Sequence, residues 1–103
     1  MKIYYGKAIY DKKEINASLS VLKSKSLTLI DGPLVKELEK KISKLFGKKY
    51  GLMVNSGSSA NLVSIASLFF KKKRPLKKGD EVIVPAISWS TTYSPLQQYG
   101  LKL

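Results

Sequence analysis

The sequence contains no cysteine and no histidine among its 103 residues. A chain without cysteine can form neither a disulfide nor a thiolate metal site. A chain without histidine has no imidazole for a zinc site or for a Ser-His-Asp triad. Acidic residues are also few, at 7 against 19 lysines and arginines, which gives a net charge of +12. These shortages exclude the common zinc and histidine-dependent sites, and the sequence predicts no metal site.

Arginine is nearly absent too, because Arg74 is the only arginine in the chain. Arginine is the preferred residue for base readout and for bidentate phosphate binding, so an excess of lysine is a weak sign of a nucleic-acid partner. The densest basic run, residues 71–78, either binds nucleic acid or forms a solvated loop. No aromatic residue alternates with its lysines, which favours the loop. We predict no specific nucleic-acid partner and keep a small basic nucleic-acid-binding protein as the rival hypothesis.

Long apolar runs are scarce as well. Residues 1–7 have no apolar segment of the kind found in export signals. Residues 50–70 carry no charge and approach the length of a membrane span, about 20 residues, but glycine, serine and asparagine interrupt them. We therefore expect a buried protein interior around a polar loop, no membrane segment, and a location in the cytoplasm.

The first half of the chain carries two helix signals, in a length that suits one small domain. Asp11, with Glu14 as its capping-box partner, predicts a helix along residues 11–23. Residues 24–29 predict a loop or a short extended piece. Pro33 predicts the first position of a second helix, which Gly47 ends. The apolar stripe of this second helix consists of Leu34, Leu38, Ile42 and Leu45.

Three short apolar runs predict strands in the second half. Residues 50–54 and 81–84 are expected to be buried strands, and residues 101–103 the beginning of a third. Helices are expected between them, along residues 60–70, buried on most sides, and within residues 88–99.

Pro95 is expected to limit the regular part of the last helix, and Gly100 to end it. The alternation of strands and helices predicts an α/β fold with an incomplete, mainly parallel sheet. Two strands and the beginning of a third cannot bury both faces of such a sheet. We therefore expect the chain to be the front part of a larger protein.

The strongest functional signal is the polar segment 55–61, between an expected strand and an expected helix. Gly57 is expected to allow a sharp turn, after which backbone amides and serine hydroxyls point at an anion such as phosphate. The alternative is that Ser58 or Ser59 only caps the helix. The segment has neither the lysine of a P-loop nor the further glycines of a dinucleotide-binding loop.

The second signal is the polar segment 85–92, which follows the second expected strand and contains the one tryptophan, Trp89. In open α/β sheets, ligands bind beyond the carboxyl ends of the strands, where both segments are expected to lie. The aromatic face suits a planar cofactor ring, and the alternative is a packing residue.

Four motifs in this order resemble the DegT/DnrJ/StrS sugar aminotransferase family. They are Gly32-Pro33 before an amphipathic helix, Phe46 to Tyr50, Asn55 to Asn61, and Gly79 to Ala86. The resemblance covers residues 25–103. It implies the N-terminal part of the large domain of an aspartate-aminotransferase-like transferase, which uses pyridoxal 5'-phosphate and acts on nucleotide-linked keto-sugars. Residues 1–30 would form an N-terminal helix and arm, and residues 31–103 the start of the cofactor-binding α/β domain.

The resemblance also implies roles by position. Gly57, Ser58 and Ser59 match the loop that holds the cofactor phosphate, and Trp89 matches the residue stacked on the pyridine ring. Thr91 and Thr92 match the loop beside the substrate. The segment around Gly32 matches one near the mouth of the site.

The family's aspartate and Schiff-base lysine have no counterpart up to Leu103, so the resemblance implies that this chain alone is inactive and that the full-length enzyme is a homodimer. We expect an aminotransferase, with a 3-dehydrase of the same family as the alternative. Two features resemble the dehydrase branch, in which histidine replaces the lysine and water is lost from the sugar. They are the long connection from Leu68 to Gly79 and a serine, Ser58, after Gly57.

Overall fold

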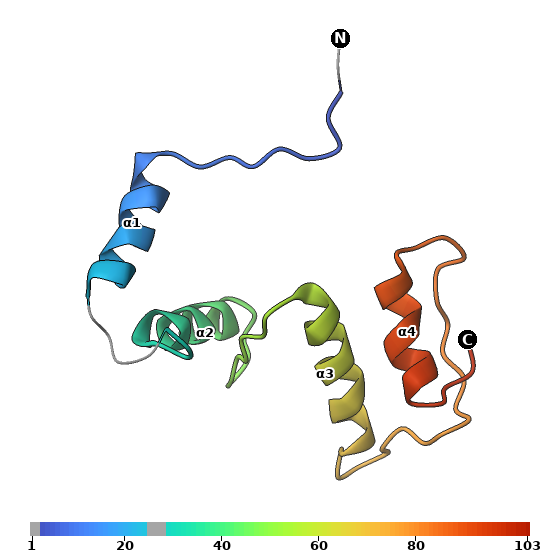
Figure 1. Cartoon of the computed structure of the whole chain (residues 1–103). Coiled ribbons are helices and arrows are strands. Elements are labelled where there is room, and N and C mark those ends of the chain that lie inside the picture. Colours follow the sequence, from blue (N-terminus) through green and yellow to red (C-terminus); the bar gives the residue numbers. More distant parts are fainter. Residues whose placement is uncertain (1–2, 25–28) are drawn as a thin grey trace. The chain divides into compact units, whose positions relative to one another are not determined.

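The computed structural model describes residues 3–24 and 29–103. Its helices, in order, are α1 (Lys12–Lys23), α2 (Pro33–Leu45), α3 (Gly57–Phe69) and α4 (Ser90–Gln98) (Figure 1). The chain divides into two compact units, Met1–Tyr50 and Gly51–Leu103. Residues 25–28 of the expected loop lie outside the described residues.

The first helix begins as its sequence predicts. The amide of Lys13 donates to Asp11 Oδ1 at 2.6 Å, and the amide of Asp11 donates to Glu14 Oε2 at 2.7 Å. These reciprocal bonds confirm the capping box, which satisfies amides that have no carbonyl partner within the helix.

The second helix also keeps its predicted ends. Pro33 occupies the first turn, and Gly47 follows the helix with a left-handed φ of 62°. The Gly47 amide donates to the Lys44 carbonyl at 3.0 Å, and the Lys48 amide to the Ser43 carbonyl at 2.7 Å. These two bonds form a Schellman motif, in which glycine is favoured because it has no Cβ.

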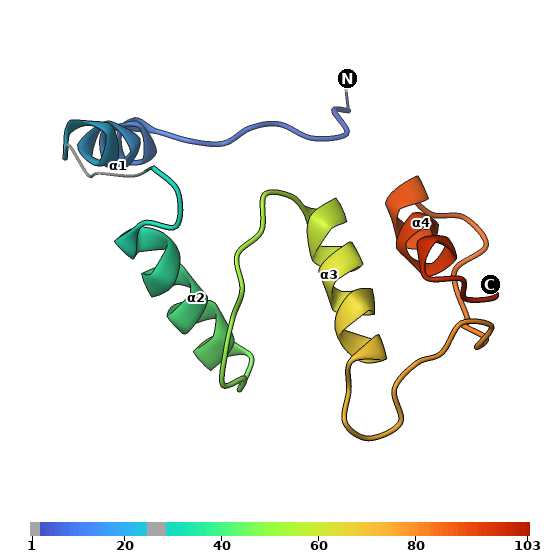
Figure 2. The same ribbon diagram turned by 60° about the horizontal axis from the view of Figure 1, so that its bottom comes forward.

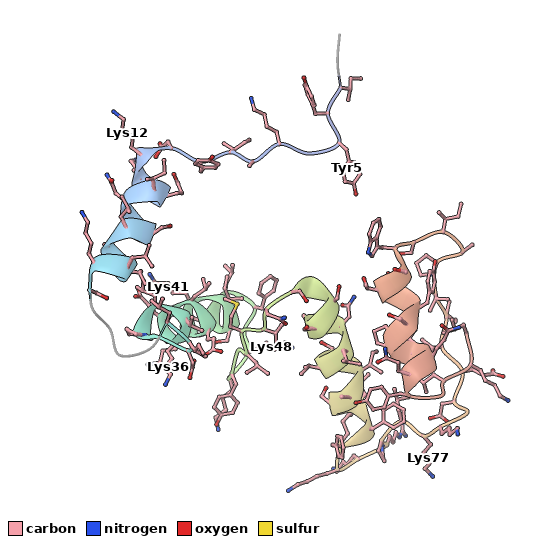
Figure 3. All side chains as sticks on the ribbon, in the orientation of Figure 1. Tyr5, Lys12, Lys36, Lys41, Lys48 and Lys77 are labelled. Carbon is pink, nitrogen blue, oxygen red and sulfur yellow. The ribbon has the colours of Figure 1, made fainter. Side chains whose placement is uncertain are left out.

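The polar face of α2 carries charges that point into solvent. Figure 3 shows Lys36 and Lys41 extending from α2. Lys41 Nζ lies 2.6 Å from Glu37 Oε1, one helical turn away. This hydrogen bond and the attraction of the cation hold the pKa of the Glu37 carboxyl below its usual value.

The second unit contains a βαβ-like crossover. The Val82 amide donates to the Lys102 carbonyl and the Lys102 amide donates to the Asp80 carbonyl, both at 2.8 Å. These bonds make a parallel bridge between Glu81 and Lys102, and α4 connects its two sides. Parallel pairing across a helix is the arrangement that the sequence predicts for this region.

The expected strands themselves do not form in the described residues, where pairing is limited to this isolated bridge. The expectation of burial is also wrong for residues 50–54 and 81–84, since Leu52 is 71% exposed and Ile83 102% exposed. A parallel strand is buried by neighbouring strands and by helices on both faces, and residues 3–24 and 29–103 do not supply them.

Burial is equally limited on the helix expected along residues 60–70. This helix, α3, begins earlier than expected, at Gly57. None of its described residues is buried, because α4 is the one described helix that packs against it. The last helix also differs from expectation: it continues through Pro95 to Gln98 before Gly100 ends it. No helix among the described residues is long and apolar enough to cross a membrane.

The basic segment 71–78 is an exposed loop in the structure, as expected. Its cations are all exposed, and Lys77 extends outward in Figure 3. Arg74 has a left-handed φ of 50°. The loop ends in a turn in which the Lys77 amide donates to Asp80 Oδ2 at 2.9 Å.

Candidate functional site

The first part of the site is the N-terminus of α3. Ser56 caps this helix: its Oγ accepts a bond from the Ser59 amide at 3.1 Å, and its carbonyl accepts one from the Ala60 amide at 3.0 Å. The alternative that Ser58 or Ser59 is the capping residue is therefore wrong. The expected loop ends before Gly57, so both serines lie in the first helical turn.

The cap decides which donors remain at this helix end. First-turn amides have no carbonyl partner within the helix, and Ser56 uses the one from Ser59. The amides of Gly57 and Ser58 are the first-turn donors that the cap does not use. Ser59 Oγ accepts a bond from the Ser56 hydroxyl at 3.1 Å, which orients it toward the cap.

Gly57 does not provide the sharp turn that the sequence suggests. Left-handed glycines occur in the structure at Gly47, Gly79 and Gly100, whereas Gly57 is not among them. A Cβ added at Gly57 would meet no heavy atom within 4 Å. The backbone there is open to the approach of another group, which is a second reason for a glycine beside a ligand.

The second part of the site is the N-terminus of α4. Trp89 is the residue that precedes the helix, and its side chain makes no capping bond. It is 75% exposed, so the structure does not support the packing alternative. Thr91 and Thr92 lie half-buried in the first turn. Ser88 Oγ lies 2.8 Å from Thr92 Oγ1, which fixes the segment before Trp89 to the helix.

Tyr93 adds a further tie to this segment. Its hydroxyl donates to the Pro85 carbonyl at 2.8 Å, across the turn that contains Trp89. This contact could not be predicted from the sequence, because a tyrosine inside an expected helix carries no signal for a bond to a preceding loop.

The structure brings the two helix N-termini to the same end of the second unit. Figures 1 and 2 show α3 and α4 side by side, with their N-termini together. Asn61 Nδ2, in the second turn of α3, donates at 3.3 Å to the Thr91 carbonyl in the first turn of α4, and the rings of Phe69 and Tyr99 lie 4.9 Å apart at the other end. Neither helix has an acidic residue in its first turn. The positive ends of both helix dipoles therefore lie at the same end of the unit without a carboxylate in either first turn to offset them.

A groove of about 270 Å³ lies beside this pair of helices. Thr92 lines it, together with Asn61 and Ser64 of α3, Val82 and Val84 of the bridge segment, and Pro95 and Leu96 of α4. Ser58, Ser59 and Trp89 do not line it. The candidate residues thus share one end of the helix pair, but they do not enclose a common cavity.

Gly32 belongs to the other unit. It precedes α2 as the N-cap and borders a cavity of about 300 Å³ with Pro33, Leu34 and Leu29. No group of three or more acidic, cysteine or histidine side chains that could hold a metal ion occurs in residues 3–24 and 29–103.

Comparison with known proteins identifies the family. The model of the DegT/DnrJ/EryC1/StrS aminotransferase family matches residues 8–103. This chain belongs to that family. The sequence resemblance is thereby confirmed over nearly the whole chain.

Two similar proteins are enzymes of the same kind. The chain is 60% identical over 94 residues to a GDP-4-keto-6-deoxy-D-mannose 3-dehydratase of Escherichia coli O55:H7, and 56% identical over 94 residues to one of Yersinia pseudotuberculosis. These matches cover 91% of this chain and 24% and 23% of the two relatives. The chain thus spans about a quarter of the length of the curated relatives it matches.

Solved structures show the same relationship. The chain resembles a GDP-4-keto-6-deoxymannose-3-dehydratase that holds a trapped PLP-glutamate geminal diamine, with a TM-score of 0.85, 55% identity, and coverage of 97% of this chain and 25% of that one. It also resembles the E. coli enzyme with bound hydrated PLP, with a TM-score of 0.82, 58% identity, and coverage of 92% and 24%. The predicted fold class, part of a PLP-dependent transferase fold, is confirmed. Between the two predicted activities, these relatives favour the dehydrase alternative over the aminotransferase.

Proposed function

We propose that this chain forms the N-terminal part of a pyridoxal-phosphate-dependent 3-dehydratase that acts on a GDP-linked 4-keto-6-deoxy sugar. The observation that carries the proposal is the match to a dehydratase structure that holds this cofactor, at 55% identity over 97% of the chain. Within this proposal, residues 1–30 are an N-terminal arm and helix, and residues 31–103 begin the cofactor-binding domain. The full-length enzyme would be a cytoplasmic homodimer.

The residues at the helix N-termini fit the chemistry of this cofactor. A phosphate group needs hydrogen-bond donors and positive potential, which the first turn of α3 provides through the amides of Gly57 and Ser58. The open space at Gly57 allows a phosphate to come close to the backbone. The Ser58 and Ser59 hydroxyls are further donors, although Ser59 is oriented by the cap.

The face of Trp89 is free to stack on a planar ring because its side chain is 75% exposed. Thr91 and Thr92, in the turn that follows, would bind substrate hydroxyl groups. When bound, the cofactor supplies an electron sink for removal of the sugar hydroxyl group as water. This chain's residues would bind and orient the cofactor and shield it. We assign no proton-transfer group within residues 1–103.

The proposal is tested with the whole polypeptide that contains residues 1–103. The polypeptide is purified, incubated with pyridoxal 5'-phosphate, glutamate and GDP-4-keto-6-deoxymannose, and the product is analysed by mass spectrometry. A dehydratase gives a product that has lost the sugar's 3-hydroxyl group. An amino sugar formed from the same mixture would instead support the aminotransferase. Failure to bind the cofactor would contradict both.

A further inference from the structure

A proline inside α4 leaves one carbonyl without its usual helical donor. In an α-helix the amide of each residue donates to the carbonyl four residues earlier, so the partner of the Thr91 carbonyl would be the amide of residue 95. Residue 95 is Pro95, which has no amide hydrogen and lies within Ser90–Gln98. The Thr91 carbonyl is therefore available to a donor from outside the helix.

That donor comes from α3. Asn61 Nδ2 donates to the Thr91 carbonyl at 3.3 Å, across thirty residues of sequence. Asn61 is exposed, so this bond lies at the surface of the helix pair, and the amide of a weak helix former here reaches a partner outside its own helix. The bond replaces one that proline cannot make.

The location of this bond gives it a consequence for the site. Asn61 lies one turn after the Ser56 cap, close to Ser58 along α3. Thr91 lies two residues after Trp89, in the first turn of α4. The bond therefore joins the two helix ends at the level of the candidate cofactor residues, whereas the Phe69–Tyr99 ring contact joins the helices at their other end.

We propose that Asn61 is a positioning residue, which uses the carbonyl left free by Pro95 to fix the distance between the phosphate-binding end of α3 and the Trp89 end of α4. The inference rests on the proposed function for the identity of the group that these ends bind. The hydrogen bond from Asn61 to the Thr91 carbonyl, which Pro95 leaves without a helical donor, does not depend on the proposed function. Asn61 would act through Ser58 and Trp89 and would not touch the reacting atoms.

The link between Pro95 and the Asn61–Thr91 hydrogen bond is tested without cofactor, by a double-mutant cycle in the whole polypeptide. Asn61→Ala, Pro95→Ala and the double variant are compared by chemical unfolding. Pro95→Ala supplies an amide for the Thr91 carbonyl. Asn61→Ala is therefore expected to lower the folding equilibrium constant about two- to tenfold more in the wild-type protein than in the Pro95→Ala protein. Changes in helix propensity cancel in the cycle. Additive effects would overturn the proposal.

A second measurement covers the case in which the Pro95→Ala protein does not fold. Hydrogen exchange of the amides near Thr91 is compared between wild type, Asn61→Asp and Asn16→Asp. Asn61→Asp keeps the shape of the side chain but removes the donor, and Asn16 is an exposed residue of α1 that serves as the control for the added charge. Faster exchange confined to Asn61→Asp supports the bond, and equal exchange in all three overturns it.

Positioning is tested by titration with pyridoxal 5'-phosphate. Asn61→Leu removes the donor at nearly the same side-chain size and adds no charge beside the phosphate-binding amides. It is expected to weaken binding about two- to tenfold and to change the circular dichroism of the bound cofactor, while Asn16→Leu leaves both unchanged. If the wild type binds but Asn61→Leu shows the same affinity and the same signal, Asn61 has only a structural role and the positioning proposal is overturned. If the wild type does not bind at all, the proposed function fails, and the positioning role fails with it.

Discussion

Leu96 and Leu101 are joined across the turn that ends α4, where the Leu101 amide donates to the Leu96 carbonyl at 3.0 Å. The Gly100 amide donates to the Gln97 carbonyl at 2.9 Å, which completes a Schellman motif. The two leucines are 5% and 6% exposed, in a chain where most apolar side chains are open to solvent. This turn leads directly to Lys102 and its parallel bridge to Glu81.

Gly100→Ala is expected to destabilise the second unit by about 1–2 kcal/mol, because Gly100 has a φ of 71° that an L side chain adopts at a cost. An added Cβ would also lie 2.7 Å from Lys78 Cγ, which has to move. The measurement is the free energy of unfolding in denaturant. Gly57→Ala is the control, since it has neither a left-handed φ nor a neighbour within 4 Å. An equal loss of unfolding free energy in both variants would contradict a cost that comes from the left-handed φ of Gly100.

Ser58→Ala is expected to weaken binding of pyridoxal 5'-phosphate roughly tenfold, because a hydroxyl bond to a charged phosphate contributes about 1.5–3 kcal/mol. The measurement is an absorbance titration of the whole polypeptide. Ser67→Ala is the matched control: Ser67 lies in the last turn of the same helix, and its hydroxyl donates to the Ser64 carbonyl at 2.7 Å. If Ser67→Ala loses as much cofactor affinity as Ser58→Ala, the effect comes from a change in the helix and the prediction for Ser58 is contradicted.

Trp89→Ala is expected to reduce both cofactor affinity and turnover, because it removes the exposed ring proposed to hold the pyridine in place. Trp89→Phe should retain much of the affinity, since a smaller aromatic face remains. The titration is combined with a measurement of turnover. Equal affinity in wild type, Trp89→Ala and Trp89→Phe would remove Trp89 from the site.

The 103-residue chain in isolation is expected to self-associate and to unfold without a sharp transition. The described residues leave many large apolar side chains exposed, among them Ile3, Leu45, Phe70 and Ile83 at 75% or more. Large exposed apolar areas and open strand edges favour association. Sedimentation and thermal unfolding test this. A single monomeric species with a cooperative transition would count against the prediction.

Nucleic acid is expected to bind this chain weakly and without sequence preference. The cations of residues 71–78 are exposed, and lysines provide phosphate contacts that do not distinguish bases. The measured affinity should fall steeply as salt is raised. A complex that selects one sequence at physiological salt would revive the rival hypothesis of a nucleic-acid-binding protein.

Features encoded by near neighbours could be predicted from the sequence. The Asp11–Glu14 capping box and the helix-ending glycines Gly47 and Gly100 depend on contacts within a few residues, and the structure confirms each of them. The start of α3 was misplaced because several serines compete for one cap, and only the backbone geometry shows that Ser56 makes the bond.

Features that depend on distant partners could not be predicted. The burial expected for residues 50–54 and 81–84 needs neighbouring strands, which the described part of the chain does not form. Apolar residues there are therefore not buried. Pro95 was noted as a limit to its helix, whereas the structure shows that its effect is an available carbonyl. Asn61 donates to this carbonyl from thirty residues away, a separation over which a single sequence gives no pairing signal.

The parallel bridge of Glu81 and Lys102 bears on the order in which the polypeptide folds during its synthesis. All the residues of this contact lie within one crossover, so it can form as soon as that segment has left the ribosome. Apolar side chains beside the bridge stay open to solvent at that stage, as Ile83 does at 102% exposure. Exposed apolar surface on a nascent chain favours aggregation with other chains.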